Sequence, residues 1–467
     1  MNGDDSVPSN NINHNVNSII FGLNDTYPNI VSGYRGVLTS VEQETAVYTY
    51  YVPTASRIEN NKEIPMYDIY VLADDTIYTP VDSTSLFEYM DWLINVDTTN
   101  LDVSKTNNMS FMFHQCYRLQ TMDTSRWDVS NVTNMQQTFH DCNCLLELDV
   151  SDWNVSNVTT LKGTFYGCLN LGELAVGDWQ VGNVTDMSFT FRGCKQFTTL
   201  AVDNWDVSNV TTFQSFISAY GGSGADQMLT TLNLSNWDTS SATNMRSMFY
   251  GCEKIVSLDV SGLDVQNVTS MYHMFSNCFG LKEINFAGWD TSSLQDMDGM
   301  FNDCKALETI DVSDFDTQNV TDMGQVFENC ASLKEIKGLE EWQTSNVVYM
   351  YEMFYKCSEL TELDLSSFDT RGVVSAFSMF AHEDIDGRLS KLTTIYVGDN
   401  WDMSSITEAN ADMSSQNMFT NCKLLKGGNG TTYDKNKTNK EYARVDAAGT
   451  PGYLTHISAK TADPEEN

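Results

Sequence analysis

The stretch 125-SRWDVSNVTNMQQTFHDCNCLLELDVS-151 decides the fold, because the chain then nearly repeats it as 151-SDWNVSNVTTLKGTFYGCLNLGELAVG-177. The cysteine of this pattern recurs along the chain, mostly at steps of 26 residues. Two longer steps, from 194 to 252 and from 357 to 422, each contain one further copy that lacks the cysteine. Self-similarity at a fixed period is the signature of a repeat protein. The sequence therefore predicts an array of about twelve coils.

Within one copy, the spacing of the apolar residues changes. In 307-LETIDVS-313, Ile310 and Val312 alternate with polar residues, which is typical of a short strand with one buried face. In 320-VTDMGQVF-327, apolar residues recur at intervals of three and four, which predicts a short helix. The predicted fold class is therefore an α/β solenoid of strand–turn–helix coils, with a parallel sheet on one face.

The ends of the chain lose the repeat, as expected where capping segments must cover the open ends of a stack. The predicted organisation is a flexible N-terminal segment (1–16), an N-terminal cap with strand-like segments and a degenerate first coil (17–96), the repeat array (97–426), a C-terminal cap (427–458) and a flexible tail (459–467).

Two columns of residues are predicted to form the core. Ten of the eleven cysteines occupy one position of the repeat, and eight of the nine tryptophans occupy another. Cysteine behaves as a small buried apolar residue, so we expect reduced thiols in the core rather than disulfides. Leu263, Phe315 and Phe368 replace tryptophan in other coils, which favours a packed core over a platform for carbohydrate. Cys144 lies outside the column and is the candidate reactive thiol.

The composition excludes some classes of function. The chain has 26 basic and 63 acidic residues and a formal net charge of −37. Such a surface repels phosphate backbones and anionic lipid, so we expect neither nucleic-acid binding nor insertion into a membrane. No apolar run is long enough to span a membrane, and neither end of the sequence resembles a signal peptide or an anchor. The residue after the tryptophan is Asp, Asn or Gln, which predicts an Asx-type turn or a helix cap.

The exposed face of the predicted strands is the candidate binding surface. It presents a strip of mainly acidic residues, which are Asp123, Asp149, Asp259, Asp311, Asp364, Glu147, Glu173, Glu283 and Tyr396. A solvated strand face without a ligand explains the same pattern equally well. Calcium on neighbouring carboxylates is an alternative, but the sequence has no calcium-binding loop motif, so we expect no metal site. His114 and His140 share one position in adjacent coils, and we expect them to be solvated.

No catalytic motif is present. The sequence contains no nucleophile elbow, zinc-protease motif, dinucleotide-binding motif or phosphate-binding loop. Each candidate carboxylate belongs to a repeated column, whereas an active site is normally a singular arrangement. We therefore expect a protein that is not an enzyme and needs no cofactor.

The repeat L-D-V-S-x-W-D-x-S-x-V-T-x-M-x-x-M-F-x-x-C-x-x-L resembles that of the BspA-like leucine-rich-repeat family of bacterial surface proteins. The segments 70-YVLADDTIYTP-80 and 442-YARVDAAGTPGYLT-455 are similar to the flanking segments of that family. The resemblance implies a leucine-rich-repeat solenoid at a cell surface, where it mediates adhesion or recognition.

The implied partner is a host or microbial surface protein or a glycan, bound through the strand face and the irregular loops at 221–228, 382–390 and 404–416. An extracellular or cell-surface location follows from the same resemblance. Two alternatives are a virion surface or tail-associated attachment protein of a bacteriophage and, much less favoured, a carbohydrate-active enzyme.

Overall fold

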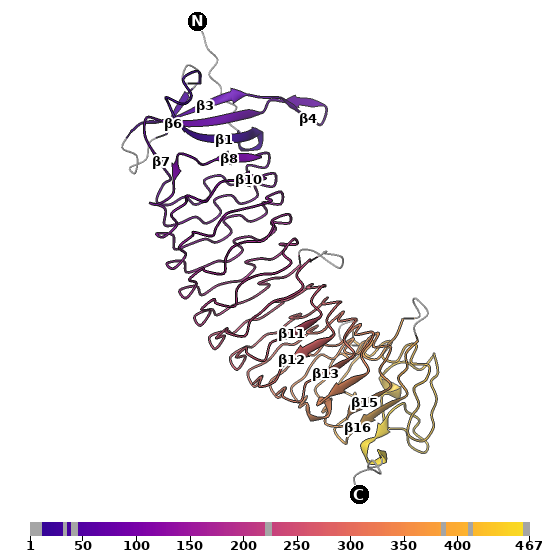
Figure 1. Ribbon diagram of the computed structural model, residues 1–467. Helices are drawn as coiled ribbons and strands as arrows, with labels where there is room; N and C mark the ends of the chain where they lie inside the picture. The colour runs from indigo at the N-terminus through magenta and orange to yellow at the C-terminus, as the bar shows by residue number, and fades with distance from the viewer. Residues whose placement is uncertain are drawn as a thin grey trace. The chain divides into compact units, whose positions relative to one another are not determined.

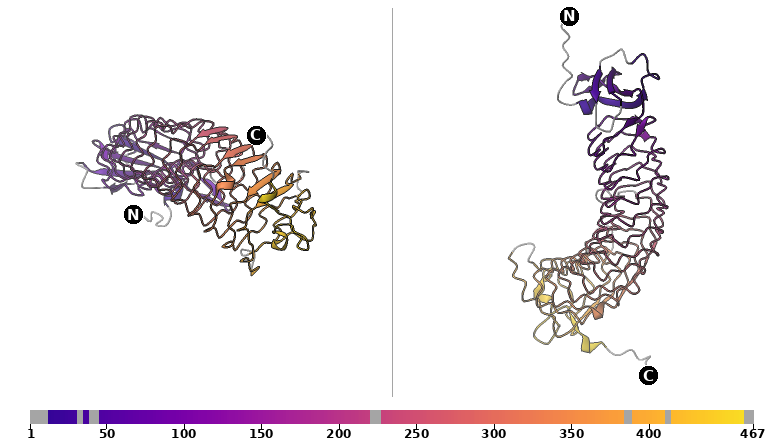
Figure 2. Two further views of the ribbon diagram at one scale, coloured as in Figure 1. Left: turned by 90° about the horizontal axis from the view of Figure 1, so that it is seen from below. Right: turned by 90° about the vertical axis from the view of Figure 1, so that its left-hand side faces the viewer.

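The computed structural model describes residues 12–30, 35–38, 45–219, 227–383, 389–409 and 414–460. The chain forms two compact units. Unit 1 comprises residues 1–210 and 216–232, and unit 2 comprises residues 211–215 and 233–467. Each unit is a stack of similar coils, and the chain follows the coils in order (Figures 1 and 2).

The regular elements are short strands and single turns of 3-10 helix (η). In unit 1 they are η1 (Ile12–Asn15), β1 (Val16–Leu23), β2 (Arg35–Leu38), β3 (Val47–Pro53), β4 (Arg57–Glu59), β5 (Lys62–Ile64), β6 (Tyr67–Ala73), β7 (Ile77–Tyr78), β8 (Asn95–Asp97), β9 (Leu101–Asp102) and β10 (Thr121–Met122). In unit 2 they are β11 (Ser257–Asp259), β12 (Glu283–Asn285), β13 (Thr309–Asp311), β14 (Glu335–Lys337), η2 (Leu339–Glu341), β15 (Glu362–Leu365), β16 (Thr394–Val397), η3 (Lys440–Tyr442), β17 (Thr455–His456) and η4 (Ile457–Ala459).

A six-stranded sheet begins unit 1, with the strand order β10-β8-β1-β6-β3-β2. β1 pairs with β6 and β8 in parallel, and β3 pairs with β6 in antiparallel orientation. Because β8 and β10 belong to the first coils, the sheet continues directly into the strand row, which is the line of extended segments that successive coils contribute, one from each. The segment expected to be flexible lies partly outside the described residues, and its last five residues form η1 and the start of β1.

Backbone hydrogen bonds between consecutive coils hold the stack together. The Phe113 N–H donates to the Thr138 carbonyl at 2.8 Å, and the Phe139 N–H donates to the Thr164 carbonyl at 2.9 Å. Each bond spans one coil, so every coil supplies the partners of the one before it. A parallel ladder of the same spacing links Asn108, Asn134, Thr160 and Asp186.

The expected helix is wrong, because the described residues contain no α-helix. Two tight turns replace it in each coil, as shown by the Met112 N–H donating to the Met109 carbonyl and the Cys116 N–H donating to the Phe113 carbonyl. The third residues of these turns, Phe111 and Gln115, both have a φ of 59°. Two four-residue turns bury residues three and four apart, as a helix does, but leave alternate N–H groups to bond the next coil.

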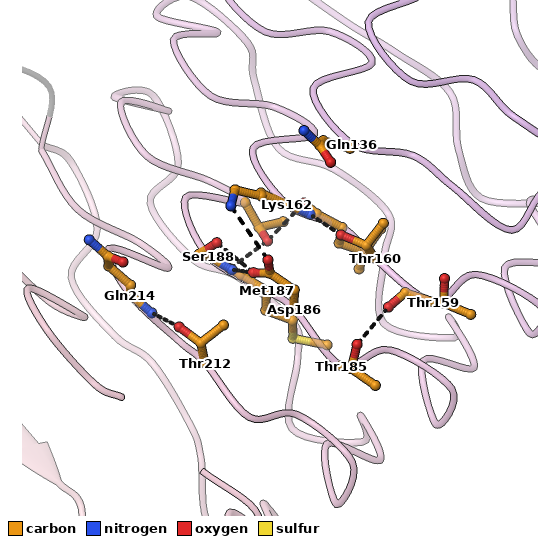
Figure 3. A network of polar contacts seen from close by, with 12 residues as sticks. Gln136, Thr159, Thr160, Lys162, Thr185, Asp186, Met187, Ser188, Thr212 and Gln214 are labelled. Atoms are coloured by element: carbon orange, nitrogen blue, oxygen red, sulfur yellow. Dashed lines mark hydrogen bonds and ion pairs between the residues drawn. The ribbon is translucent and has the colours of Figure 1, made fainter. Parts of the chain in front are cut away.

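Side-chain oxygen atoms accept hydrogen bonds at the start of these turns and stabilise them. Lys162 N–H donates to the Thr160 hydroxyl oxygen at 3.2 Å, and Ser188 N–H donates to Asp186 Oδ1 at 2.8 Å (Figure 3). The residue that begins the turn, Thr160 or Asp186 in these coils, must therefore supply an oxygen that accepts the N–H two residues later, and Asn, Asp and Thr all can. The Asx turn predicted after the tryptophan is confirmed in the same way, with Ser130 N–H donating to Asp128 Oδ1 at 3.0 Å.

The strand prediction is confirmed in part. Parallel pairing of successive coils is present in β8–β10, β11–β12, β13–β14 and β15–β16. The corresponding rows at 147–149, 173–175 and 199–201 do not form regular strands. In β13, Ile310 is buried and its neighbours Thr309 and Asp311 are exposed, as the alternating sequence predicted.

The two core columns are confirmed. The ten cysteines are buried, and no disulfide joins any of the eleven cysteines, all of which are described. The thiols are also hydrogen-bond donors: Cys142 donates to the Phe113 carbonyl at 3.2 Å, and Cys168 donates to the Phe139 carbonyl at 3.1 Å.

The tryptophans stack one coil upon the next. The rings of Trp127 and Trp153 lie 6.0 Å apart with planes 3° from parallel. The indole N–H of Trp179 donates to the Val150 carbonyl at 3.1 Å, and that of Trp205 donates to the Val176 carbonyl at 2.9 Å. Trp401, beside the C-terminal cap, is half-buried and donates to the Ala443 carbonyl.

One coil of unit 2 contains a single extra residue, and the unit ends in the segment predicted to be the C-terminal cap. The step from Cys330 to Cys357 has 27 residues, and the extra residue falls at η2, which follows Gly338 with a φ of 81°. At the end of the unit, β17 pairs with β16 in parallel and so extends the strand row (Figure 2). The buried Asp446 accepts hydrogen bonds from Asn429, Thr431 and Gly452, which fixes the loops of the cap.

Candidate functional site

A hollow of about 620 Å³ lies over the strand row at the start of unit 1. Its lining residues are Asn95, Val96, Asp97, Thr121, Met122, Asp123, Glu147, Leu148, Asp149 and Glu173. Four of the nine predicted site residues are therefore brought together here. The hollow also includes Asp97, the first residue of the predicted array, which was not among the predicted site residues.

The aspartates of the hollow are held by local turns. Asp123 Oδ1 accepts the N–H and the hydroxyl of Ser125, at 3.0 Å and 2.6 Å. Asp149 Oδ1 accepts the same two groups of Ser151, at 3.1 Å and 2.6 Å. The serine hydroxyl and N–H hydrogen bonds lower the pKa of both carboxyls, so both are anionic at neutral pH. Each aspartate thus has a structural role and a fixed orientation, and its second oxygen is not needed for the turn.

The charge of the hollow has one sign. Five of its ten lining residues are Asp or Glu, and none is Lys, Arg or His. The side chains of Val96, Met122 and Leu148 are almost fully buried, so the polar and acidic side chains between them form the accessible surface. Such a surface attracts cations and repels anions. The arrangement can therefore bind a cationic group.

The remaining predicted residues lie on the strand row of unit 2. Asp259 accepts a hydrogen bond from Asn285 Nδ2 at 3.1 Å, Glu283 is exposed on β12, and Asp311 pairs in register with Lys337. These carboxylates line neither hollow, and each lies on a different strand.

The last two predicted residues contact a lysine that the sequence analysis did not consider. Lys460 Nζ lies 2.8 Å from Asp364 Oδ2 and 5.2 Å from the centroid of the Tyr396 ring. No repeat signal could have found Lys460, since it follows the C-terminal cap. The repeat pattern therefore pointed to Asp364 and Tyr396 but not to Lys460, which contacts both.

The two histidines are adjacent but not solvated, so that expectation was wrong. The rings of His114 and His140 lie 4.8 Å apart, and both side chains are buried. His114 Nδ1 lies 2.8 Å from Glu88 Oε1. Burial, with the charge of His114, lowers the pKa of His140 to about 4. No group of three potential metal ligands occurs among the described residues.

The predicted loops 221–228, 382–390 and 404–416 lie partly outside the described residues, at 221–226, 384–388 and 410–413. A second hollow of about 460 Å³ lies in the C-terminal cap, where Tyr433, Asp434, Lys437 and Tyr442 are among the lining residues. It combines both charges with aromatic rings, and no motif in the sequence pointed to it.

Stacked coils, a strand row and core columns of one residue type define a repeat protein. A family model described as "Mycoplasma protein of unknown function, DUF285" matches overlapping segments at 81–174, 141–220, 170–284, 219–336, 270–392 and 306–426. These segments cover well over half of the chain, which therefore belongs to this family.

Other comparisons add little. No curated protein matches the chain. Among solved structures, it is similar to the crystal structure of a TLR13–ssRNA13 complex, with 15% identity and a TM-score of 0.19 over 69% of this chain and 48% of that chain. The chain thus spans about half the length of that protein, and a score this low supports no functional conclusion. Among the described residues, no helix has the length and apolar character needed to cross a membrane.

Proposed function

We propose that this chain is a non-enzymatic recognition protein, a leucine-rich-repeat solenoid that binds a surface protein or glycan through its strand rows. The observation that carries the proposal is the exposed acidic hollow between Asn95 and Glu173. Carboxylates gathered on one surface repel one another unless solvent or a partner compensates their charge. The resemblance to BspA-like surface proteins supports an extracellular or cell-surface location.

The absence of catalysis is part of the proposal. Asp123 and Asp149 each use one carboxylate oxygen to accept a hydrogen bond within a turn. The same turn recurs in other coils, for example where Ser261 N–H donates to Asp259 Oδ1. A residue that repeats as part of the scaffold is a poor candidate for a general acid or base. Incubation with a panel of polysaccharides should accordingly release no product.

A binding screen tests the recognition function. The purified chain is passed over immobilised host matrix proteins, microbial surface proteins and glycans, and the retained ligands are then tested with the variant Glu147→Lys/Glu173→Lys. Charge reversal in the hollow should weaken retention at least tenfold. The control Glu340→Lys/Glu341→Lys makes the same charge change at η2, outside the hollow, and should leave retention unchanged. Equal loss in both variants would show that the strand row is not the binding surface.

A further inference from the structure

The strand row of unit 2 holds a lysine of this same chain. Lys460 Nζ lies 2.8 Å from Asp364 Oδ2 and 3.5 Å from Glu362 Oε1, above the ring of Tyr396. The hydrogen bond to Asp364 raises the pKa of Lys460. Burial alone would raise the pKa of Asp364, but the hydrogen bonds from Lys460 and Ser366 outweigh it and lower that pKa. The contact is therefore an ammonium–carboxylate pair.

The pair Glu362 and Asp364 has a counterpart in the hollow of unit 1, namely Glu147 and Asp149. In both pairs a Glu precedes an Asp by two residues, and a buried leucine lies between them. In both, the Asp Oδ1 accepts the N–H of the serine two residues later, at 3.1 Å. Both pairs therefore occupy the same position of the repeat and have the same turn behind them.

The two pairs differ in whether a lysine of the chain neutralises their negative charge. In unit 2, lysines also neutralise nearby exposed glutamates, with Lys334 Nζ 2.7 Å from Glu308 and Lys391 Nζ 2.7 Å from Glu359. In the part of the chain that the structure describes, no ion pair involves Glu147 or Asp149. The charged residues that line the hollow with them are all carboxylates.

We propose that the Glu147–Asp149 pair binds the side chain of a lysine presented by a partner protein. The inference rests on the proposed function and names the chemistry that the hollow recognises. Lys460 is the observed partner at this position of the repeat in unit 2, and its ammonium group contacts both carboxylates of the pair there. Asp123 and Glu173 extend the acidic surface to neighbouring coils, so two lysines on one segment gain from avidity.

A labelled peptide with two lysines separated by one glycine tests the site on the full chain. Fluorescence anisotropy should show binding that weakens with added salt, as expected for exposed charges. A peptide with glutamine in place of lysine should not bind. Cadaverine, which has the ammonium groups without a peptide, should compete only weakly if a protein segment is the ligand. Competition by cadaverine at the affinity of the peptide would overturn the assignment to a protein.

The variant Glu147→Gln/Asp149→Asn should weaken peptide binding at least tenfold. Asparagine keeps the turn acceptor, as Asn233 does when it accepts Ser235 N–H in its own coil, so this variant should fold. The control Glu340→Gln/Glu341→Gln removes two charges at η2 and should bind within twofold of the unchanged chain. If the double substitution in the hollow binds as tightly as the control, the proposal is wrong.

A second variant tests the counterpart in unit 2. Lys460→Gln vacates the Glu362–Asp364 pair and should raise the peptide stoichiometry from one to two, as measured by calorimetry. An unchanged stoichiometry would contradict the equivalence of the two pairs. If lysine peptides fail to bind while charge reversal at Glu147 and Glu173 still abolishes retention of a ligand from the screen, this inference falls and the proposed function stands.

Discussion

At the scale of single residues, the repeat is specified by hydrogen-bond acceptors and donors with fixed partners. The asparagine of the N-V-T triplets is one example: Asn131 Nδ2 donates to the Ser104 carbonyl at 2.8 Å, and Asn157 Nδ2 donates to the Ser130 carbonyl at 2.7 Å. The aspartates before and after the tryptophan close turns, and thiols and several indoles donate hydrogen bonds to carbonyls of the preceding coil. Most conspicuous side chains of the repeat therefore serve the scaffold.

The cysteine column predicts a sharp difference in thiol reactivity. Burial raises the pKa of Cys116 and Cys278 to about 12 and that of the other column members as well, so thiolate is scarce and shielded. Cys144 is only half-buried. Iodoacetamide at pH 8 should modify Cys144 at least ~100-fold faster than any column cysteine, measured by mass spectrometry of peptides. In urea all eleven should react alike, and rapid native modification of Cys168 would contradict the buried column.

The candidate site shows how much of a surface can be predicted residue by residue from the sequence alone. The acidic strip was found from its repeat position, and four of its members do share one hollow. The turn role of Asp123 and Asp149 was missed, although a serine two residues later is the same signal that identified the turn after the tryptophan. Lys460 could not be found, because a contact between a tail and a repeat has no periodic pattern.

At the scale of elements, the helix prediction failed for an identifiable reason. Apolar spacing of three and four fits a helix and also fits two consecutive four-residue turns. The distinguishing signal is the residue before the cysteine, which is Gly, Asn or Asp in most coils, as in Gly167, Gly193, Asn277 and Asn329. These residues tolerate positive φ, which a helix never requires in its interior.

Gln115 offers a test of these turns. It has a φ of 59° and occupies the position of Gly167 and Gly193 in later coils. Gln115→Gly should leave the free energy of unfolding unchanged or raise it by up to about 1 kcal/mol, since glycine adopts this conformation without strain. Gln115→Ile should lower it by about 1–3 kcal/mol, because a β-branched residue is strained there. The measurement is urea denaturation.

The control for the two Gln115 variants is Gln120→Ile, which makes the same substitution at an exposed residue whose φ is not positive. It should cost less than about 0.5 kcal/mol, as surface substitutions usually do. If Gln115→Ile lowers the free energy of unfolding by no more than the control does, the segment does not form the two turns in solution.

At the scale of the whole molecule, the net charge of −37 is compatible with folding because most carboxylates are exposed or held in turns. Unit 2 contains exceptions. Asp298 is 6% exposed, one of its oxygens has no hydrogen-bond partner among the described residues, and burial with the charge of Asp322 raises its pKa to about 7. Burial with the charge of Glu352 raises the pKa of Glu328 to about 7.

These two groups predict a contribution to stability that falls as pH rises towards neutrality. The folded state keeps the Asp298 proton up to about pH 7, whereas the unfolded chain loses it near pH 4, so the protonated group stabilises the fold at acid pH and that stabilisation is lost as pH rises through 7. The free energy of unfolding of Asp298→Asn minus that of the unchanged chain should grow between pH 4 and 7, by up to about 1.4 kcal/mol per pH unit, and level off above. Hydrogen exchange over residues 294–327 gives the local readout.

Asp311→Asn is the matched control, because hydrogen bonds from Ser313 lower the pKa of Asp311. Its stability difference from the unchanged chain should be constant between pH 5 and 8. Comparing each variant with the unchanged chain removes the opposite contribution of His273, whose pKa burial lowers. A flat difference for Asp298→Asn would mean that the carboxyl is solvated.

The coil with one extra residue has a consequence for how such chains vary. Its additional residue is accommodated at η2, and the backbone bonds to both neighbouring coils keep their order. Small changes of length are thus tolerated at that corner, while the gain or loss of a complete period preserves every contact between neighbours. Duplication or loss of whole coils would therefore yield longer and shorter proteins that still fold, with the same two ends and a different number of surface positions between them.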